Sequence, residues 1–271
     1  MNKTLIYGLV LALVLWYISK FSWLIALGIG IVLLVMLVWK RRAVILTQFA
    51  AQAYTIKGDK EKGEKLFQKA YKTGEMPADC KLRYSAFCLR ENKYEKARHL
   101  VNEVINSSRT TENEKMNAKH NLAVLLWKEG NLAEAIETME EVHEKITSTN
   151  TYGTLGVLYL AKAKEDGDYS KVVDFMLEAY DYNDSDYTVA DNLGEKYLRI
   201  GEYEKAKEVY EKLLVMEYFT PMPYYNFGLV LKALGENERA LENFEKALNG
   251  RFTAVLTVNK EMIQAEIDSL K

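Results

Sequence analysis

The chain has 271 residues with 36 basic and 38 acidic side chains, and 49% of its residues are apolar. It has only two cysteines, and a helix would place Cys80 and Cys88 roughly 12 Å apart, too far for a disulfide. Five basic residues and no acidic residue lie in residues 1–42, so the remainder holds 31 basic and 38 acidic residues. This excess of acidic residues disfavours a nucleic acid partner, because phosphate binding needs a basic face.

Two apolar segments without charge open the sequence, residues 5–18 and 23–39. One continuous helix would place Lys20 in the middle of a bilayer, so we expect two membrane-spanning helices joined by a tight turn at Lys20. Aromatic and basic residues are enriched where a helix leaves the hydrocarbon. The predicted membrane-interface residues are Trp16, Tyr17, Lys20, Trp23, Trp39, Lys40, Arg41 and Arg42.

The basic residues predict the orientation of this hairpin. Lys3 and the cluster at 40–42 lie at its two open ends, against Lys20 alone at the turn, which favours a cytoplasmic location for both ends. We therefore expect an integral, multi-pass protein of a bacterial plasma membrane whose remaining residues are cytoplasmic. Two alternatives stay open: a cleavable signal peptide, and a single span that would place the remainder outside.

The second apolar segment is predicted to continue directly into the helix that follows it. No glycine or proline lies between Ile31 and Lys57, and Gly58 is the first clear helix breaker. We expect a rigid mount close to the membrane rather than a flexible tether.

The rest of the chain repeats one amphipathic segment. GEYEKAKEVYEKLL at residues 201–214 has the layout of LGENERALENFEKAL at 234–248 and of EGNLAEAIETMEEV at 129–142. Self-similarity at such a period indicates a stacked helical array, because one helix pair cannot bury its apolar face alone. The predicted turn residues, spaced by 34, 38, 37, 34 and 34 positions, are Gly58, Asn92, Gly130, Gly167, Gly201 and Gly235.

Small residues recur where the two helices of each unit would cross. At the eighth position of the unit they are Ala51, Ser85, Ala123, Gly156, Gly194 and Gly228. At the twentieth position, where Val172 departs from the pattern, the residues are Gly63, Ala97, Ala135, Val172, Ala206 and Ala240. From residue 44 to about 254 this pattern resembles the tetratricopeptide repeat family.

The resemblance implies an all-α fold, a right-handed α-solenoid of about six helix–turn–helix units. The expected domains are the transmembrane hairpin at residues 1–42 and the solenoid at 43–271, which ends in a capping helix at about 255–270. The expected units cover about 44–77, 78–111, 116–149, 149–186, 187–220 and 221–254.

The sequence contains no motif that indicates catalysis. It has no phosphate-binding loop and no HExxH, CxxC or GxSxG motif. Its three histidines, His99, His120 and His143, fall in different predicted helices, which disfavours a metal site. We therefore expect no enzymatic activity, no cofactor and no bound metal.

In the family that the repeats resemble, the first helices of the units line a concave groove, which implies a binding surface for a protein or peptide. Asparagine recurs at the sixth position as Asn121, Asn192 and Asn226, and an amide can both donate to and accept from a peptide backbone. The alternative is that these asparagines only bond a neighbouring helix. The other implied groove residues are Gln48, Gln52, Arg83, Arg90, His120, Trp127, Lys128, Asp191, Glu195, Arg199, Tyr225 and Lys232.

Together these features favour a membrane-anchored scaffold that holds a protein or peptide partner in its groove at the cytoplasmic face of the membrane. The alternative is an assembly factor or accessory subunit of an integral membrane complex, in which the hairpin itself binds other membrane helices. The expected partners are therefore a protein or peptide, the lipid bilayer and, in the second case, other integral membrane proteins.

Overall fold

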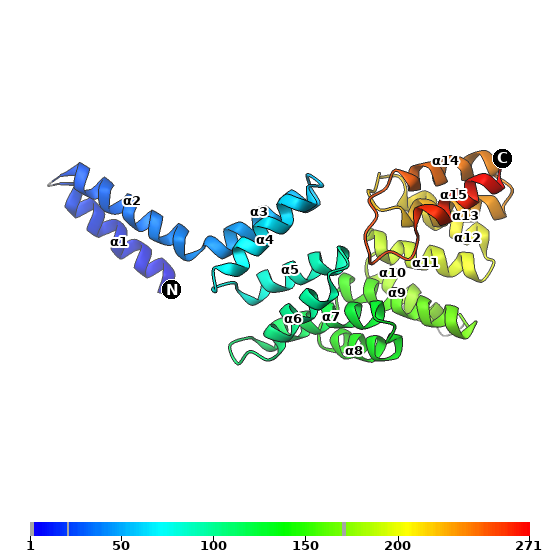
Figure 1. Cartoon of the computed structure of the whole chain (residues 1–271), viewed down its shortest axis with the longest axis horizontal. Coiled ribbons are helices and arrows are strands. Elements are labelled where there is room, and N and C mark those ends of the chain that lie inside the picture. Colours follow the sequence, from blue (N-terminus) through cyan, green and yellow to red (C-terminus); the bar gives the residue numbers. More distant parts are fainter. Residues whose placement is uncertain (1–2, 21, 170–171) are drawn as a thin grey trace. The chain divides into compact units, whose positions relative to one another are not determined.

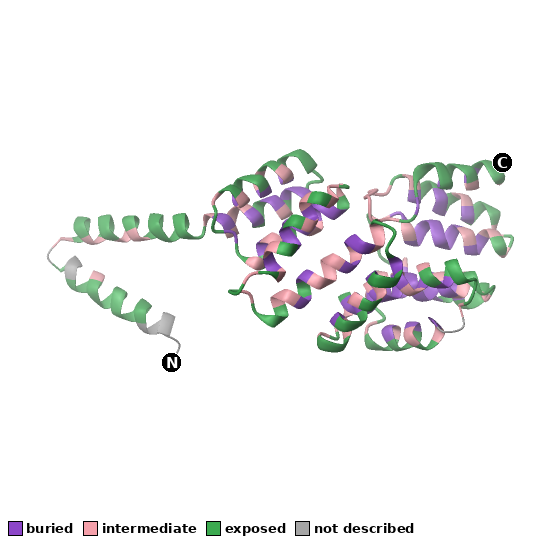
Figure 2. Cartoon of the chain, turned by 60° about the horizontal axis from the view of Figure 1, so that its bottom comes forward, coloured by how far each residue is buried: buried purple, intermediate pink, exposed green. Residues whose placement is uncertain are grey.

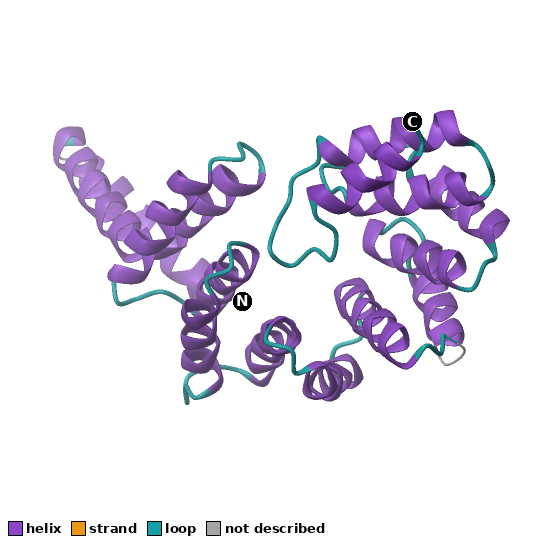
Figure 3. Cartoon of the chain, turned by 45° about the vertical axis from the view of Figure 1, so that its right-hand side comes forward, coloured by secondary structure: helices purple, strands orange, loops and turns teal. Residues whose placement is uncertain are grey.

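The structure, a computed structural model, describes residues 3–20, 22–169 and 172–271. Within these residues every regular element is a helix and none is a strand, which confirms the all-α prediction (Figure 3). The fifteen helices are α1 (Lys3–Ser19), α2 (Trp23–Lys40), α3 (Arg42–Thr55), α4 (Lys60–Lys72), α5 (Ala78–Arg90), α6 (Tyr94–Ile105), α7 (Glu112–Lys128), α8 (Leu132–Lys145), α9 (Thr149–Asp166), α10 (Val173–Tyr182), α11 (Tyr187–Arg199), α12 (Tyr203–Leu213), α13 (Met222–Ala233), α14 (Asn237–Leu248) and α15 (Lys260–Ser269).

The chain divides into two compact units, residues 1–80 and 81–271. The first unit holds α1 to α4 and the start of α5, and the second holds the rest of α5 and the remaining helices (Figure 1). The predicted domain boundary at residue 42 lies inside the first unit, because a single residue separates α2 from α3.

In the first unit, large apolar side chains are exposed on α2 and on the described part of α1 (Figure 2). No residue of α2 is buried, and Leu34, for example, is 61% exposed. Among the described residues, Trp23–Lys40 is the one helix long and apolar enough to cross a membrane, with a mean hydropathy of 2.3. A signal sequence near an N-terminus would meet the same criterion.

Within the described residues the structure therefore gives one candidate span, where the sequence predicted two. The side chains of α1 are described only over Tyr7–Tyr17, which form a shorter apolar stretch. The side chain of Lys3, on which the predicted orientation partly depends, lies outside the described residues.

Helical hydrogen bonding continues through the junction between α2 and α3. The backbone N–H of Arg41 donates to the carbonyl of Leu37 at 3.0 Å, and the Arg41 carbonyl accepts from the N–H of Ile45 at 3.1 Å. The guanidinium of Arg42 pairs with Glu75 at 2.9 Å, which ties the start of α3 to the chain just after α4. The apolar helix thus leads into the first repeat helix without a loop between them, as the sequence predicted.

The predicted turn residues reverse the chain between the two helices of each pair. All six have positive φ, from 59° at Asn92 to 90° at Gly130. This left-handed conformation is open to glycine and tolerated by asparagine, which explains why those two residue types recur at this position.

The helices of a pair approach most closely where a glycine faces an aromatic ring. A Cβ atom on Gly194 of α11 would lie 2.6 Å from the ring of Tyr210 on α12, and one on Gly228 would lie 2.5 Å from the ring of Phe244. Both rings are fully buried. The small residue at the eighth position therefore makes room for the large side chain of the second helix.

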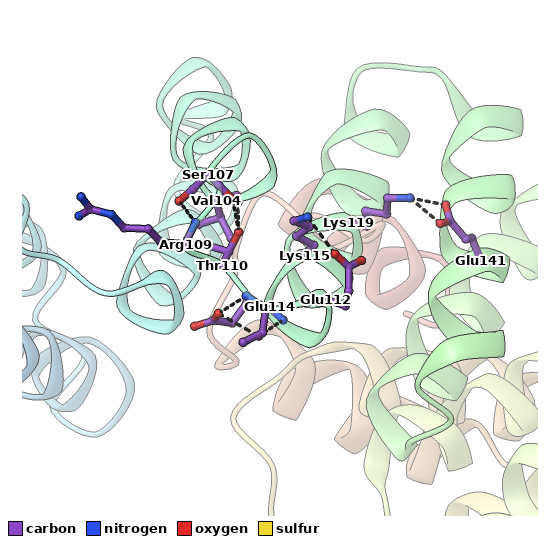
Figure 4. A network of polar contacts seen from close by, with 10 residues as sticks. Val104, Ser107, Arg109, Thr110, Glu112, Glu114, Lys115, Lys119 and Glu141 are labelled. Carbon is purple, nitrogen blue, oxygen red and sulfur yellow. Dashed lines mark hydrogen bonds and ion pairs between the residues drawn. The ribbon is translucent and has the colours of Figure 1, made fainter.

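The third pair begins earlier than the sequence predicted, because Thr111 caps α7 ahead of residue 116. The hydroxyl of Thr111 accepts from the N–H of Glu114 at 3.2 Å, and the Glu114 carboxylate accepts from the N–H of Thr111 at 2.7 Å. Further along, Lys119 of α7 pairs with Glu141 of α8 at 2.5 Å (Figure 4).

The fourth pair lacks the close glycine–ring contact. Val172 precedes α10 instead of lying inside it, and α10 has 10 residues against 14 in α8. A Cβ atom on Gly156 would instead meet the amide of Asn192 at 2.5 Å. The departure at Val172 therefore coincides with a shorter second helix.

The last helix, α15, covers the end of the array. The side chain of Asn259 accepts from the N–H of Met262 at 2.8 Å and so caps the start of the helix. Ile263 and Ile267 are buried in the same apolar core as the residues of α13 and α14.

We predict that Gly194→Ala destabilises the pair α11–α12 by roughly 1–3 kcal/mol, because the added methyl group would overlap the Tyr210 ring. Hydrogen exchange should accelerate in α9 to α14 and not in α3 or α4, because each repeat contacts only its neighbours. Gly28→Ala is the control, since a Cβ atom there would meet nothing within 4 Å. Uniform loosening of the whole array would contradict this prediction.

Candidate partner-binding surface

The predicted groove residues all lie on first helices of the pairs. Gln48 and Gln52 are exposed on α3 in the first unit, where they line a hollow of about 340 Å³ together with Ile45 and Phe49. The others lie in the second unit, on α5 (Arg83, Arg90), α7 (His120, Asn121, Trp127, Lys128), α11 (Asp191, Asn192, Glu195, Arg199) and α13 (Tyr225, Asn226, Lys232).

The three asparagines bond neighbouring first helices. The amide of Asn121 donates to the carbonyl of Leu82 at 3.0 Å, and that of Asn192 donates to the carbonyl of Gly153 at 2.9 Å. The amide of Asn226 donates to Asp191 Oδ1 at 3.1 Å. Of the two interpretations of these asparagines, the structure favours the second, in which they join the first helices of successive pairs.

Asp191 is the centre of a buried polar group. Its Oδ1 accepts from the hydroxyl of Tyr210 at 2.9 Å as well as from Asn226. Burial, and to a lesser degree the carboxylate of Glu195, raises the pKa of Asp191 to about 7, although the bonds from Asn226 and Tyr210 lower it. Asp191 and Asn226 are only 8% and 1% exposed, so both act inside the array.

Two of the predicted groove cations are already neutralised within the chain. Arg199 pairs with Glu195 one turn earlier on α11 at 2.8 Å. Lys232 pairs with Glu266 of α15 at 2.7 Å and donates to Ser269 at 2.7 Å, which ties the capping helix to α13. The sequence did not single out Glu266 or Ser269, because their partner lies far away along the chain.

His120 is not available as a cation either. Its Nε2 lies 2.8 Å from Thr154 Oγ1 on α9, and burial lowers its pKa to about 4. The imidazole is therefore neutral near pH 7, and it links α7 to α9.

Lys128 differs from Arg199, Lys232 and His120 in that it is a cation without an opposite charge beside it among the described residues. Its Nζ lies 4.0 Å from the centre of the Trp127 ring, and among the described residues no carboxylate pairs with it. Partial burial lowers its pKa to about 8, because the charged form is desolvated. An uncompensated ammonium group at the end of a first helix favours a partner that brings a carboxylate.

The predicted membrane-interface residues form one cation–aromatic contact at the turn between α1 and α2 and another at the C-terminal end of α2. At the turn, Lys20 Nζ lies 4.2 Å from the ring centre of Trp16, and at the other end the Arg42 guanidinium lies 4.7 Å from that of Trp39. The other predicted interface residues close to these contacts in the sequence are also exposed: Tyr17, Trp23, Lys40 and Arg41.

Sequence reasoning missed a hollow beside the connection between α12 and α13. It has a volume of about 640 Å³, and its apolar lining includes Val215 and Phe219, each 83% exposed. Arg239 and Glu211 pair beside it at 3.0 Å. The sequence feature that could have indicated this hollow is the run VMEYF at 215–219. It is mostly apolar, although it lies in a connection, where polar residues are usual.

No group of three or more potential metal-ligating side chains occurs in the part of the chain that the structure describes. Nothing in the repeats indicates catalysis. The arrangement can bind and hold a partner, since it offers charged and aromatic side chains on one set of helices.

These helices form an α-solenoid of paired helices. Three segments, residues 117–142, 188–216 and 223–249, match the tetratricopeptide repeat family model, which supports that family for the repeats. No curated protein matches the sequence.

Solved structures show the same fold at low sequence identity. A tetratricopeptide repeat protein from Thermus thermophilus has 18% identity and a TM-score of 0.57, over 72% of this chain and 98% of its own. One from Parabacteroides merdae has 17% identity and a TM-score of 0.61, over 85% and 84%. PilF from Pseudomonas aeruginosa has 13% identity and a TM-score of 0.54, over 84% and 99%.

We predict that Asp191→Asn flattens the pH dependence of stability. The raised pKa means that between about pH 4 and pH 7 the folded chain holds a proton that the unfolded chain releases, so the free energy of unfolding falls as pH rises. The asparagine side chain of the variant stays neutral at every pH. The substitution should therefore raise the free energy of unfolding at pH 8 by roughly 2 kcal/mol or more. Thermal unfolding at pH 5 and pH 8 measures this, with exposed Asp184→Asn as the control. An unchanged pH slope in Asp191→Asn would refute it.

Proposed function

We propose that this protein is a membrane-anchored scaffold whose repeats bind a protein or peptide partner at the cytoplasmic face of a bacterial plasma membrane. One observation carries the proposal: α2, an apolar helix without a buried residue, continues through Arg41 into the first repeat helix. A surface of this kind is stable in lipid and unfavourable in water, whereas the repeats have a charged exterior.

The proposal includes two spans, α1 and α2, with both ends of the hairpin in the cytoplasm. The turn carries one basic residue, Lys20, against three at residues 40–42. The cation–aromatic contacts at Trp16 and Trp39 support this assignment, because both kinds of residue favour the membrane–water interface. With one span only, the repeats would lie on the opposite side.

The partner is expected to carry acidic groups. Among the described residues no carboxylate pairs with Lys128. Arg83 and Arg90 are exposed on α5, whereas Arg199 and Lys232 are paired with carboxylates of this chain. Charges that a partner compensates contribute mainly to orientation and association rate. Confinement near the membrane would then raise the partner's effective concentration there.

A second candidate function is that of an assembly factor or accessory subunit of a membrane complex. Gly8, Gly28 and Gly30 favour it, because a Cβ atom on any of them would meet nothing within 4 Å. Small exposed residues let a helix of another membrane protein approach closely in lipid.

The test is a pull-down from native membranes in mild detergent, with mass spectrometry of the captured proteins. We predict that Lys128→Glu lowers recovery of the partner at least about tenfold, because it replaces an attraction by a repulsion. Lys145→Glu on α8 is the matched control and should leave recovery unchanged.

A third bait, Gly28→Leu with Gly30→Leu, tests the hairpin. A partner that is kept by Lys128→Glu and lost by this variant would overturn the groove function in favour of the assembly factor.

A further inference from the structure

The connection between α14 and α15 returns to the beginning of the second unit. We call residues 250–258 the strap. It starts tightly packed, because a Cβ atom on Gly250 would lie 2.9 Å from the backbone nitrogen of Pro221. The N–H of Arg251 then donates to the carbonyl of Phe219 at 2.6 Å.

The middle of the strap bonds to the first helix of the second pair. The backbone N–H of Ala254 donates to the carbonyl of Arg90, the last residue of α5, at 2.9 Å. In Figures 1 and 3 the connection leaves the α13–α15 end of the unit and extends to the end of α5. The carbonyl of Arg90 is one of those that a helix leaves without an internal partner.

The strap is anchored in the core on both sides of its middle. Phe252, ahead of the middle, packs against the core of the last pairs, and Val258, beyond the middle, is buried in that core. Lys260 Nζ lies 5.5 Å from the centre of the Phe252 ring. Between these anchors Thr253, Ala254 and Val255 are half-buried, so the bond to Arg90 holds the strap at its middle.

Within the second unit, the two elements joined by this bond belong to opposite ends of the row of first helices. Arg90 ends α5, the row continues through α7, α9 and α11, and the strap leaves from beside α13. Bridging the ends of this row restricts access to the side of the unit that the first helices line. Arg90 is also an exposed cation of the proposed groove, so the strap sits at the proposed binding surface itself.

We infer that the strap is an autoinhibitory segment: it occupies the Arg90 end of the groove, and an extended partner peptide must displace it to bind. This inference rests on the proposed function of the groove. The partner would take over the bond by donating a backbone N–H to the Arg90 carbonyl, which selects an extended segment over a helix.

The test uses the full chain in mild detergent. Ala254→Pro removes the N–H that bonds to Arg90, and Ala254→Ser keeps it. Hydrogen exchange of residues 250–258 should be slow in the unaltered chain and in Ala254→Ser, and fast in Ala254→Pro. Exchange in α11 to α14 reports whether each variant is folded.

The same three proteins then serve as baits in native membranes. Recovery of the partner should rise roughly three- to tenfold in Ala254→Pro, the range expected for loss of one hydrogen bond from the closed state. Fast exchange of the strap in the unaltered chain would overturn the inference.

A different result would separate the two proposals. If Ala254→Pro and Ala254→Ser recover the same amount of partner, and Lys128→Glu recovers less, the strap's role is overturned and the groove function stands. If no bait retains a partner, including Ala254→Pro with its released strap, the groove function is overturned, and the strap's role with it.

Discussion

Close approach of the two helices within a pair is the constraint on which the array depends. At Gly194 the backbone of α11 comes so near to α12 that the Tyr210 ring fills all the space a side chain would need. The same ring carries the hydroxyl that bonds Asp191, and Asp191 in turn accepts from Asn226 of the next first helix. One glycine therefore determines both the packing within a pair and the polar contact to the following pair.

Much of this architecture could be predicted from the sequence, because it is encoded locally. The turn residues are glycine or asparagine since φ is positive there, and the spacing of these residues shows the period of the array. The helix α7 starts several residues ahead of the expected unit at 116–149, because a capping box at Thr111 extends a helix independently of the repeat pattern.

The binding surface was harder to predict, because it depends on which residues meet across the array. Asparagine at the sixth position indicated either a peptide contact or a contact between helices. The bonds to Leu82, Gly153 and Asp191, which only the structure shows, favour the contact between helices. The pairing of Lys232 with Glu266, and the strap's bond to Arg90, join residues far apart in sequence. No local period records such contacts.

The proposed scaffold combines an apolar helix, a junction of one residue and a groove in which no described carboxylate pairs with Lys128. The most direct measurement is photo-cross-linking in intact cells from a reactive amino acid placed at Arg83 on first helix α5 or at Glu137 on second helix α8, both exposed. A cross-linked protein in the membrane fraction from position 83 and not from 137 is the predicted result. Equal cross-linking from both positions, or cross-linking from 137 alone, would contradict the groove as the working surface.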